Sequence, residues 1–176
     1  MSLIVHINGW PGTGKLTIAR CLTARLGGRL LDNHTLLNPA EALFDRESPH
    51  WWPLRNSVRA IVLEFAARVD AATPLVLTDA LADIYSDRQT FEDYRPLAAK
   101  RGARLVSVIL RCAPEEKLRR LASPGRAEQH KLTNAALLQS WQVKLQLLRP
   151  TGVDVLELDV TSISPEQAAA ELALRI

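Results

Sequence analysis

A glycine-rich stretch near the start of the chain constrains its fold more than any other feature. Its sequence is Gly9-Trp10-Pro11-Gly12-Thr13-Gly14-Lys15-Leu16-Thr17, and it joins an apolar, strand-like run to a helical pattern. Glycines let the backbone turn tightly and direct several N–H groups toward one centre, and a helix that begins there adds the positive end of its dipole. The lysine supplies a compact positive charge at the same point. The stretch therefore predicts a site for the phosphates of a nucleoside triphosphate.

The rest of the chain alternates short apolar runs with longer helical patterns. Strands are expected at residues 3–8, 29–31, 74–78, 104–110 and 153–158. These runs are rich in Val, Ile and Leu without strict polar alternation, which is typical of parallel strands buried on both faces. Helical patterns between them include residues 58–69, 83–99 and 137–148, and in the first of these the expected apolar face is Val58, Ile61, Val62, Phe65 and Val69. We predict an α/β fold, a single three-layer αβα domain with a five-stranded parallel sheet over residues 1–176.

Composition excludes several other classes of protein. The chain has 176 residues, of which 47% are hydrophobic and 23% are charged, as expected for one soluble domain. It shows neither a leader-like start nor an apolar run that could span a membrane, so we expect a cytoplasmic protein without a membrane partner. Cys21 and Cys112 lie in apolar contexts and are expected to be reduced. The net charge of +3 is too small to indicate binding to nucleic acid.

One position departs from the general pattern of triphosphate-binding loops. Ser or Thr ordinarily follows the lysine and ligates Mg²⁺, whereas here Leu16 follows Lys15 and Thr17 comes one place later. This spacing resembles the adenylate kinase form of the loop, in which the later threonine touches phosphate and water largely holds the metal. The resemblance implies that ATP is bound by Gly9, Pro11, Gly12, Thr13, Gly14, Lys15, Leu16 and Thr17, with Thr17 also on the metal side.

Beyond residues 9–17, which we call the phosphate loop, the chain resembles the P-loop small-molecule kinases. These include adenylate, shikimate and gluconate kinases and the chloramphenicol phosphotransferase group. Only the phosphate loop is a specific match, because elsewhere the likeness lies in the order and spacing of elements. The resemblance implies a kinase that uses ATP and Mg²⁺, as a monomer or homodimer. It also implies an acceptor-side insert at residues 35–60 and a helical lid at residues 117–132.

An aspartate ends the second predicted strand, in Leu31-Asp32-Asn33-His34. Shikimate-kinase-like enzymes carry Asp-x-Asp here, facing the acceptor, and this chain has His34 in place of the second acid. An acceptor hydroxyl must be oriented and lose its proton during transfer. The resemblance therefore implies a catalytic role for Asp32 and a place near the substrate for His34. The alternatives are a helix N-cap for Asp32 and a polar loop position for His34.

A second aspartate, Asp79, ends the third predicted strand. An acid at the tip of a strand beside the phosphate loop can hold the water shell of Mg²⁺ and also face the acceptor. Leu16 makes such an acid more important, because the loop supplies one fewer direct oxygen. The alternative for Asp79 is a cap on the helix expected at residues 83–99, and Asp83 is a weaker candidate for the acceptor side.

Two arginines on the helical pattern at residues 58–69 and just before it are candidate acceptor ligands. Arg55 and Arg59 lie four residues apart and therefore on one edge of that helix. In the kinases that the chain resembles, arginines in this region clamp the phosphate or carboxylate of the acceptor. The alternative is a solvated basic edge. Trp51 and Trp52 either wall an acceptor pocket or fill the core.

Residues 117–132 carry five basic side chains and one acid. The net charge of this segment therefore exceeds the net charge of +3 of the whole chain. This composition beside a Pro-Gly turn resembles the lid of these kinases, whose arginines close over the transferring phosphoryl group. Arg120 and Arg126 match the lid spacing best. A solvated helix face is the alternative.

These observations predict an ATP-dependent phosphotransferase that moves the γ-phosphoryl group to a hydroxyl of a small molecule. Lys15, Asp32, Arg120 and Arg126 would carry catalysis. One alternative is a nucleoside monophosphate kinase. Another is a nucleotide-binding regulator without transfer activity, which Leu16 favours. The acceptor is not identified by the sequence, and the resemblance places the base-stacking residues near 161–163.

Overall fold

The computed structural model describes residues 2–121 and 144–176 and shows a five-stranded parallel sheet. Its strands are β1 (Ser2–Asn8), β2 (Arg29–Asp32), β3 (Leu75–Asp79), β4 (Ala103–Arg111) and β5 (Asp154–Asp159). They lie in the order β2-β3-β1-β4-β5, and every neighbouring pair is parallel. The predicted fold is confirmed, and each predicted strand end lies within one residue of the observed end.

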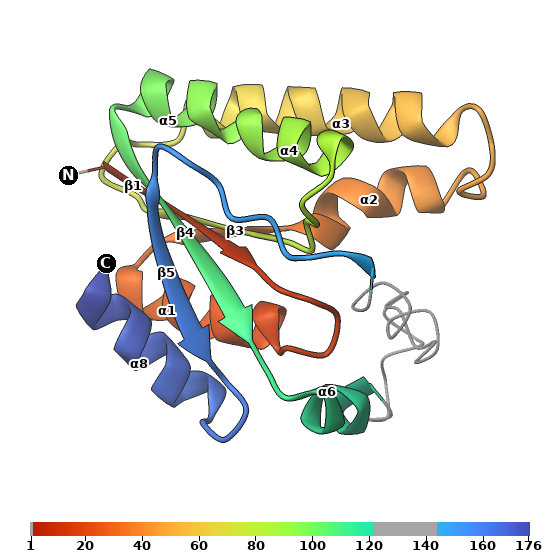
Figure 1. The fold of residues 1–176 in the computed structure, drawn as a ribbon. Coiled ribbons are helices and arrows are strands. Elements are labelled where there is room, and N and C mark those ends of the chain that lie inside the picture. The colour runs from red at the N-terminus through yellow and green to blue at the C-terminus, as the bar shows by residue number, and fades with distance from the viewer. Residues whose placement is uncertain (1, 122–143) are drawn as a thin grey trace.

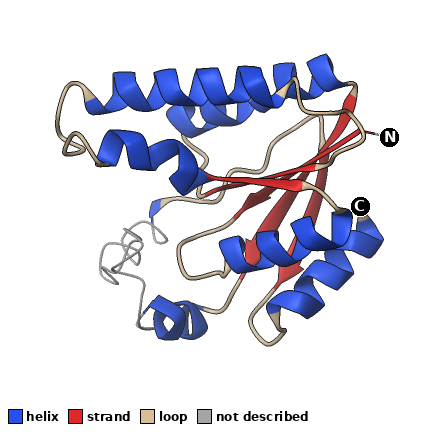
Figure 2. Ribbon diagram, turned by 180° about the vertical axis from the view of Figure 1, so that it is seen from behind, coloured by secondary structure: helices blue, strands red, loops and turns tan. Residues whose placement is uncertain are grey.

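Helices cover both faces of the sheet (Figure 1, Figure 2). They are α1 (Lys15–Leu26), α2 (Asn33–Glu41), α3 (Trp51–Ala66), α4 (Tyr85–Glu92), α5 (Tyr94–Arg101), α6 (Pro114–Leu121) and α8 (Pro165–Arg175). On one face, α1 and α8 pack on Val5 and Ile7 of β1, and on the other α3, α4 and α5 pack on Ile4. Alternate residues of β1 thus enter two different cores, which explains its continuous apolar run.

The helix expected at residues 83–99 is two helices, α4 and α5, which meet at Asp93. Pro96 lies in the first turn of α5 and has no N–H to donate to the carbonyl of Glu92. The hydrogen-bond ladder is therefore interrupted where α4 ends. The helix expected at residues 137–148 lies mostly outside the described residues, and at its described end residues 145–148 are not helical, because Leu147 forms a bridge with Ala82 instead.

The prediction for the buried face of α3 is wrong. The expected stripe included Ile61 and Phe65, yet these side chains are 58% and 57% exposed. The helix instead buries Trp51, Arg55, Arg59 and Leu63, which follow one another at four-residue spacing. Arg59 stays buried because Asp93 and the carbonyl of Thr90 accept its hydrogen bonds. Ile61 and Phe65 instead line an apolar groove beside the edge strand β2.

Arg101, the last residue of α5, fixes the connection between α3 and β3. Its guanidinium is buried and donates hydrogen bonds to four backbone carbonyls. These belong to Ala66 (3.1 Å), Val69 (2.5 Å), Asp70 (3.0 Å) and Thr73 (2.8 Å). A single side chain therefore satisfies carbonyls that a loop would otherwise leave to water.

The structure also describes the two cysteines and the lengths of the apolar helices. Cys21 is half-buried, Cys112 is buried, and both are free thiols. No helix among residues 2–121 and 144–176 is long and apolar enough to cross a membrane.

Candidate functional site

The phosphate loop joins the carboxyl end of β1 to the start of α1. Gly12 and Gly14 have φ angles of 90° and 84°, in the left-handed region where a side chain is strained. A Cβ on Gly12 would also lie 2.8 Å from the carbonyl oxygen of Lys117 in α6. Lys15 Nζ donates to the carbonyls of Gly9 (2.6 Å) and Trp10 (3.2 Å), which keeps the ammonium against the loop. This backbone geometry is that of an anion-binding turn at a helix N-terminus.

Asn8, the last residue of β1, anchors the start of the phosphate loop. Its side chain is buried and accepts the N–H groups of Gly9 (3.0 Å) and Leu81 (2.8 Å) through Oδ1. Its Nδ2 donates to the carbonyls of Leu81 (3.0 Å) and Leu148 (3.3 Å). The loop is thereby tied to the segments that follow β3 and precede β5. Sequence reasoning missed Asn8, although an amide at the end of a buried strand is a signal of such an anchor.

Arg120 lies against the phosphate loop from the side of α6. Its guanidinium donates to the carbonyls of Thr13 (3.2 Å) and Val160 (2.9 Å), and it pairs with Glu116 (2.6 Å). Within the predicted lid, residues 117–121 therefore end a helix that packs on the loop. For Arg120 the alternative of a solvated face is wrong. Arg126 and the remainder of residues 117–132 lie outside the described residues.

Asp32 forms the N-cap of α2. Its Oδ1 accepts the N–H of His34 (3.0 Å) and its Oδ2 accepts the hydroxyl of Thr35 (3.0 Å). The capping alternative is thus what the geometry shows. The carboxylate stays half-exposed and keeps further lone pairs, so a role toward the acceptor remains a prediction, as does the role of His34.

Asp79, at the end of β3, is 1% exposed. Its Oδ2 lies 3.3 Å from His6 Nε2 and accepts the hydroxyl of Tyr94. Burial by itself raises the pKa of this carboxyl, but His6 and the charge of Arg59 outweigh it and hold the pKa below its ordinary value. Asp79 is therefore ionised at neutral pH.

Arg59, in α3, lies beside Asp79 and Tyr94. Its guanidinium donates to Asp93 (3.0 Å), to the Tyr94 hydroxyl (3.3 Å) and to the carbonyl of Thr90 (2.7 Å). Burial lowers the pKa of Arg59, but Tyr94 and Asp79 raise it by more, so the charge is retained. We call His6, Arg59, Asp79 and Tyr94 the buried ionic network. Sequence reasoning missed His6 and Tyr94, although a histidine within an apolar strand was a signal.

Tyr94→Phe is expected to lower the free energy of unfolding by about 1–3 kcal/mol at neutral pH, because it removes the hydroxyl between Arg59 and Asp79. The lowered pKa of Asp79 gives stability that is present above the unfolded carboxyl pKa of about 3.9 and is lost as the pH falls through the folded value. Urea unfolding of parent and variant should therefore show a difference that shrinks as the pH falls below the unfolded carboxyl pKa. A difference independent of pH contradicts this account, and Tyr85→Phe, at an exposed position, is the control.

The residues fit Mg²⁺ only as an ion held mainly by nucleotide phosphates and water. Within the described parts of the chain, Asp79 Oδ1 is a buried carboxylate oxygen without a hydrogen-bond partner, so it can accept from a metal-bound water. Thr17 is exposed in the first turn of α1. The same parts of the chain contain no cluster of three or more His, Cys, Asp or Glu that could enclose a metal. Both metal assignments stay predictions.

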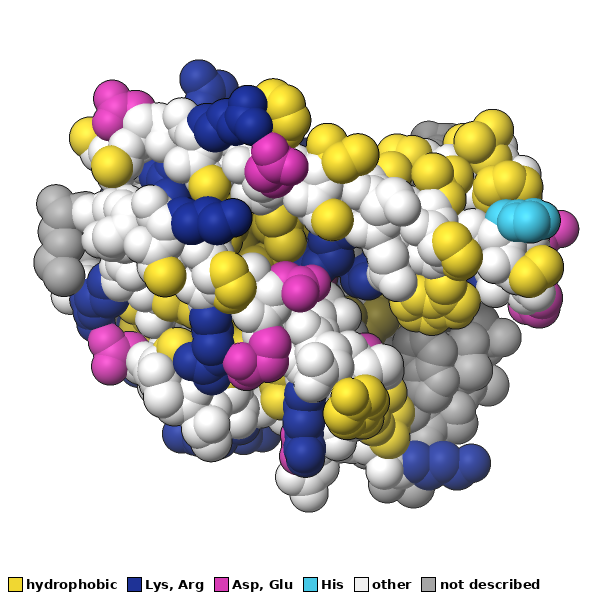
Figure 3. Space-filling model, turned by 90° about the horizontal axis from the view of Figure 1, so that it is seen from above, with side chains coloured by type: hydrophobic (Ala, Val, Ile, Leu, Met, Phe, Trp, Pro, Cys, Tyr) yellow, Lys and Arg dark blue, Asp and Glu magenta, His cyan; other side chains and the backbone are white. Residues whose placement is uncertain are grey.

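A hollow of about 810 Å³ lies among α3, α4 and α5, and we call it the α3–α5 hollow. Arg55 and Arg59 line it, and Lys or Arg side chains are visible inside the hollow on this face of the molecule (Figure 3). Arg55 is 8% exposed, and its Nη1 donates to Asn56 (3.1 Å). No atom of the described residues accepts from its Nε. Burial and the charge of Arg59 lower the pKa of Arg55, and Asp79 opposes them.

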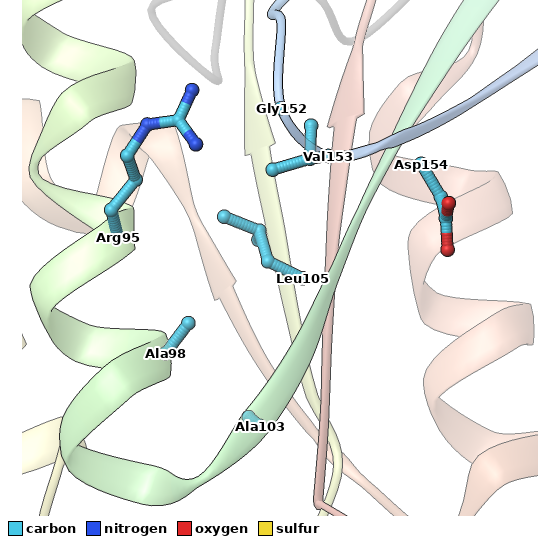
Figure 4. A pocket seen from close by; sticks show the side chains of 7 residues that line it. All are labelled: Arg95, Ala98, Ala103, Leu105, Gly152, Val153 and Asp154. Carbon is cyan, nitrogen blue, oxygen red and sulfur yellow. The ribbon is translucent and has the colours of Figure 1, made fainter.

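A separate hollow of about 580 Å³ lies between α5 and the amino ends of β4 and β5 (Figure 4). Arg95 lines it but is already paired with Glu92 (2.7 Å) and the carbonyl of Thr151 (2.6 Å). The phosphate loop follows the carboxyl end of β1, at the opposite edge of the sheet. Since ligands of open α/β sheets bind at the carboxyl edge, this hollow is not the candidate site.

A sequence profile of the AAA domain family matches residues 5–136. The chain belongs to the AAA domain family. A Halobacterium salinarum protein provisionally named adenylate kinase is 27% identical to this AAA domain over 169 residues, which are 96% of this chain and 86% of that protein.

Solved structures share the fold of this AAA domain. One from Chloroflexus aurantiacus, provisionally described as a kinase, has a TM-score of 0.72 at 15% identity, covering 99% of this chain and 98% of that one. Shikimate kinase from Acinetobacter baumannii has a TM-score of 0.57 at 16% identity, covering 99% and 93%. The predicted P-loop small-molecule kinase fold is thus confirmed.

The candidate site of this AAA domain has two neighbouring parts. Lys15 and Arg120 meet at the phosphate loop, and Arg55, Arg59 and Asp79 meet beneath α3. Asn8 and Asp79 are register partners in β1 and β3, so the two parts share one edge of the sheet. Asp83 lies apart from both, in a surface pair with Arg88 (2.6 Å). Trp51 is buried in the core, whereas Trp52 is exposed and lines the α3–α5 hollow, where a role toward an acceptor stays a prediction.

Proposed function

We propose that the chain is an ATP-dependent phosphotransferase that moves the γ-phosphoryl group of ATP to a hydroxyl of a small molecule. One observation carries the proposal: the phosphate loop follows Asn8, and Asp79, the register partner of Asn8, is linked through Tyr94 to Arg59 of the α3–α5 hollow. A donor and an acceptor held there would lie side by side, which is what a transfer in line requires.

The donor half of the reaction rests on the phosphate loop. Its backbone N–H groups and the N-terminus of α1 would bind the phosphates, and Lys15 would leave its two carbonyl partners to reach the β- and γ-phosphates. Arg120, held beside Thr13, would add positive charge at the same point. Mg²⁺, when bound, would neutralise charge on the phosphate oxygens. Arg126 is proposed from the sequence alone to close over the phosphoryl group.

In the transfer itself, the acceptor oxygen forms a bond to the γ-phosphorus while the bond to the bridging oxygen of ADP breaks. The hydroxyl proton leaves toward a carboxylate, and Asp32 is the proposed orienting acid on the acceptor side. Arg55 would hold the acceptor. Arg59 would act through the position of Tyr94 and Asp79, because its donors already serve three partners.

The test is a screen for ADP release with ATP, Mg²⁺ and a panel of small alcohols, sugars, hydroxy acids and nucleoside monophosphates. We expect ADP to form with one class of acceptor and to require Mg²⁺. ADP at background level with every acceptor, together with intact ATP binding, contradicts the proposal and supports the nucleotide-binding regulator.

A second candidate, a nucleoside monophosphate kinase, is favoured by the Halobacterium salinarum relative with its provisional adenylate kinase name. It predicts that nucleoside monophosphates are the best acceptors of the panel. In that reaction Arg55, whose Nε has no acceptor among the described residues, would face the acceptor phosphate.

A further inference from the structure

Exposed aromatic side chains and a buried cation share the α3–α5 hollow. Trp52 is 56% exposed and Tyr85 is 79% exposed, and both line the hollow together with Arg55. Trp52 also packs edge-on against the buried Trp51, with ring centroids 4.7 Å apart, so its ring is supported from behind. Exposed aromatic surface gathered at a concave site is typical of a surface that a ligand covers.

The hollow contains one buried cation with a donor that has no acceptor among the described residues. Among the acids that line it, Glu64 pairs with Arg68 (2.7 Å), Asp93 pairs with Arg59 (3.0 Å), and Asp87 accepts the N–H of Ala82 (2.8 Å). Arg55 is the contrasting case. Within residues 2–121 and 144–176 its Nε has no acceptor although the side chain is more than nine-tenths buried. A buried charged donor without an acceptor is costly, and an anionic ligand removes that cost.

Arg55 and Trp52 also act on each other. The guanidinium carbon lies 5.7 Å from the centre of the Trp52 ring, so the cation and the ring face one site. A ligand whose anionic group meets Arg55 would therefore bring the rest of its surface against Trp52.

We propose that the acceptor is a ring-bearing anion, with a carboxylate or phosphate at Arg55 and a flat ring against Trp52 and Tyr85. The proposal rests on the proposed function and deepens it, because it names the class of acceptor. It assigns Trp52 and Tyr85 as specificity-determining residues. An uncharged open-chain polyol or sugar lacks both the flat aromatic ring and the charge and should bind poorly. Two sources share the required chemistry, an aromatic hydroxy acid and a nucleoside monophosphate.

The experiment measures equilibrium binding to the whole protein without ATP, by titration calorimetry, so that it does not depend on transfer. The probes are a matched set. They comprise 3-(hydroxymethyl)benzoate, its ring-saturated analogue 3-(hydroxymethyl)cyclohexanecarboxylate, the uncharged benzyl alcohol, the polyol anion gluconate, and the monophosphates AMP and CMP. We expect the anions with an aromatic ring to bind about tenfold more tightly than the probes that lack either the aromatic ring or the charge.

Variants assign each preference to a residue. Trp52→Leu should abolish the preference for the aromatic ring and keep the preference for the anion, and Arg55→Gln should do the reverse. Phe65→Leu is the matched control, because Phe65 is an equally exposed aromatic of α3 that lies outside the hollow. Thermal unfolding of each variant verifies the fold. The affinity for 3-(hydroxymethyl)benzoate, compared with the affinities for AMP and CMP, distinguishes the two sources.

Two binding results overturn the inference. One is that gluconate or the saturated analogue binds as tightly as every anion with an aromatic ring, and the other is that Trp52→Leu leaves the preference for the aromatic ring unchanged. Failure of the proposed function looks different. If anions with an aromatic ring bind as expected but no ADP is released, the proposed transfer reaction is wrong and the assignment of the hollow is unaffected. If sugars alone cause ADP release, the transfer reaction is supported and the assignment of the hollow is wrong.

Discussion

Lys15→Ala is expected to lower ATP-dependent turnover on the order of 10²–10³-fold while the protein stays folded. The phosphoryl group carries negative charge on its oxygens during the transfer. Lys15 is the first residue of α1 and places a cation at the phosphate loop. Its removal leaves the loop N–H groups and Arg120 in place, so nucleotide binding should weaken without being abolished. The measurement is kcat/KM with the acceptor that the screen identifies.

Thermal unfolding with and without ATP gives a second readout of the same variant. A ligand that binds the folded state raises the melting temperature, and by more the tighter it binds, so the ATP-dependent shift should shrink in Lys15→Ala. Lys144→Ala is the matched control, because Lys144 is an exposed lysine outside the proposed site. A folded Lys15→Ala protein that turns over as fast as the parent would rule out the proposed donor site.

Arg101→Ala is expected to lower the free energy of unfolding by about 3–5 kcal/mol. The substitution leaves four carbonyls of the α3–β3 connection without their donor and also removes a packed side chain. Arg101→Lys should recover only part of the loss, since one ammonium cannot reach all four oxygens. Urea denaturation at equilibrium measures both differences.

The control for this experiment is Arg68→Ala. Arg68 lies in the same connection but is exposed and pairs with Glu64 at the surface, so its removal should change stability by no more than about 0.5 kcal/mol. If Arg101→Ala proves as mild as this control, the four hydrogen bonds do not hold the connection, and another interaction must.

Local sequence patterns were sufficient for the sheet and for the phosphate loop. The strands are buried on both faces, so their apolar runs stand out without knowledge of any partner. The loop is equally local, because the turn, the lysine and the start of α1 all lie within residues 9–17. For Asp32, the pattern offered two roles, and the cap on α2 became visible only once the helix start was known.

Side chains whose partners lie far along the chain were not predictable in the same way. Periodicity measures apolar spacing, so it assigned Ile61 and Phe65 to the core and missed that α3 buries Arg55 and Arg59. Arg59 turns inward because Asp93 and Tyr94, more than thirty residues away, receive its donors. Arg101 carried no motif at all, and its role follows only from the fold.

The buried ionic network has a consequence for how this chain can change over evolutionary time. His6, Arg59, Asp79 and Tyr94 come from four different elements, β1, α3, β3 and α5, and each satisfies another's charge or hydroxyl. Replacing one member leaves its neighbour buried without a partner for its charge or hydroxyl. Selection should therefore act against single replacements. Related sequences should therefore keep all four residues or exchange them as a set, and this covariation should persist even among relatives whose acceptors differ.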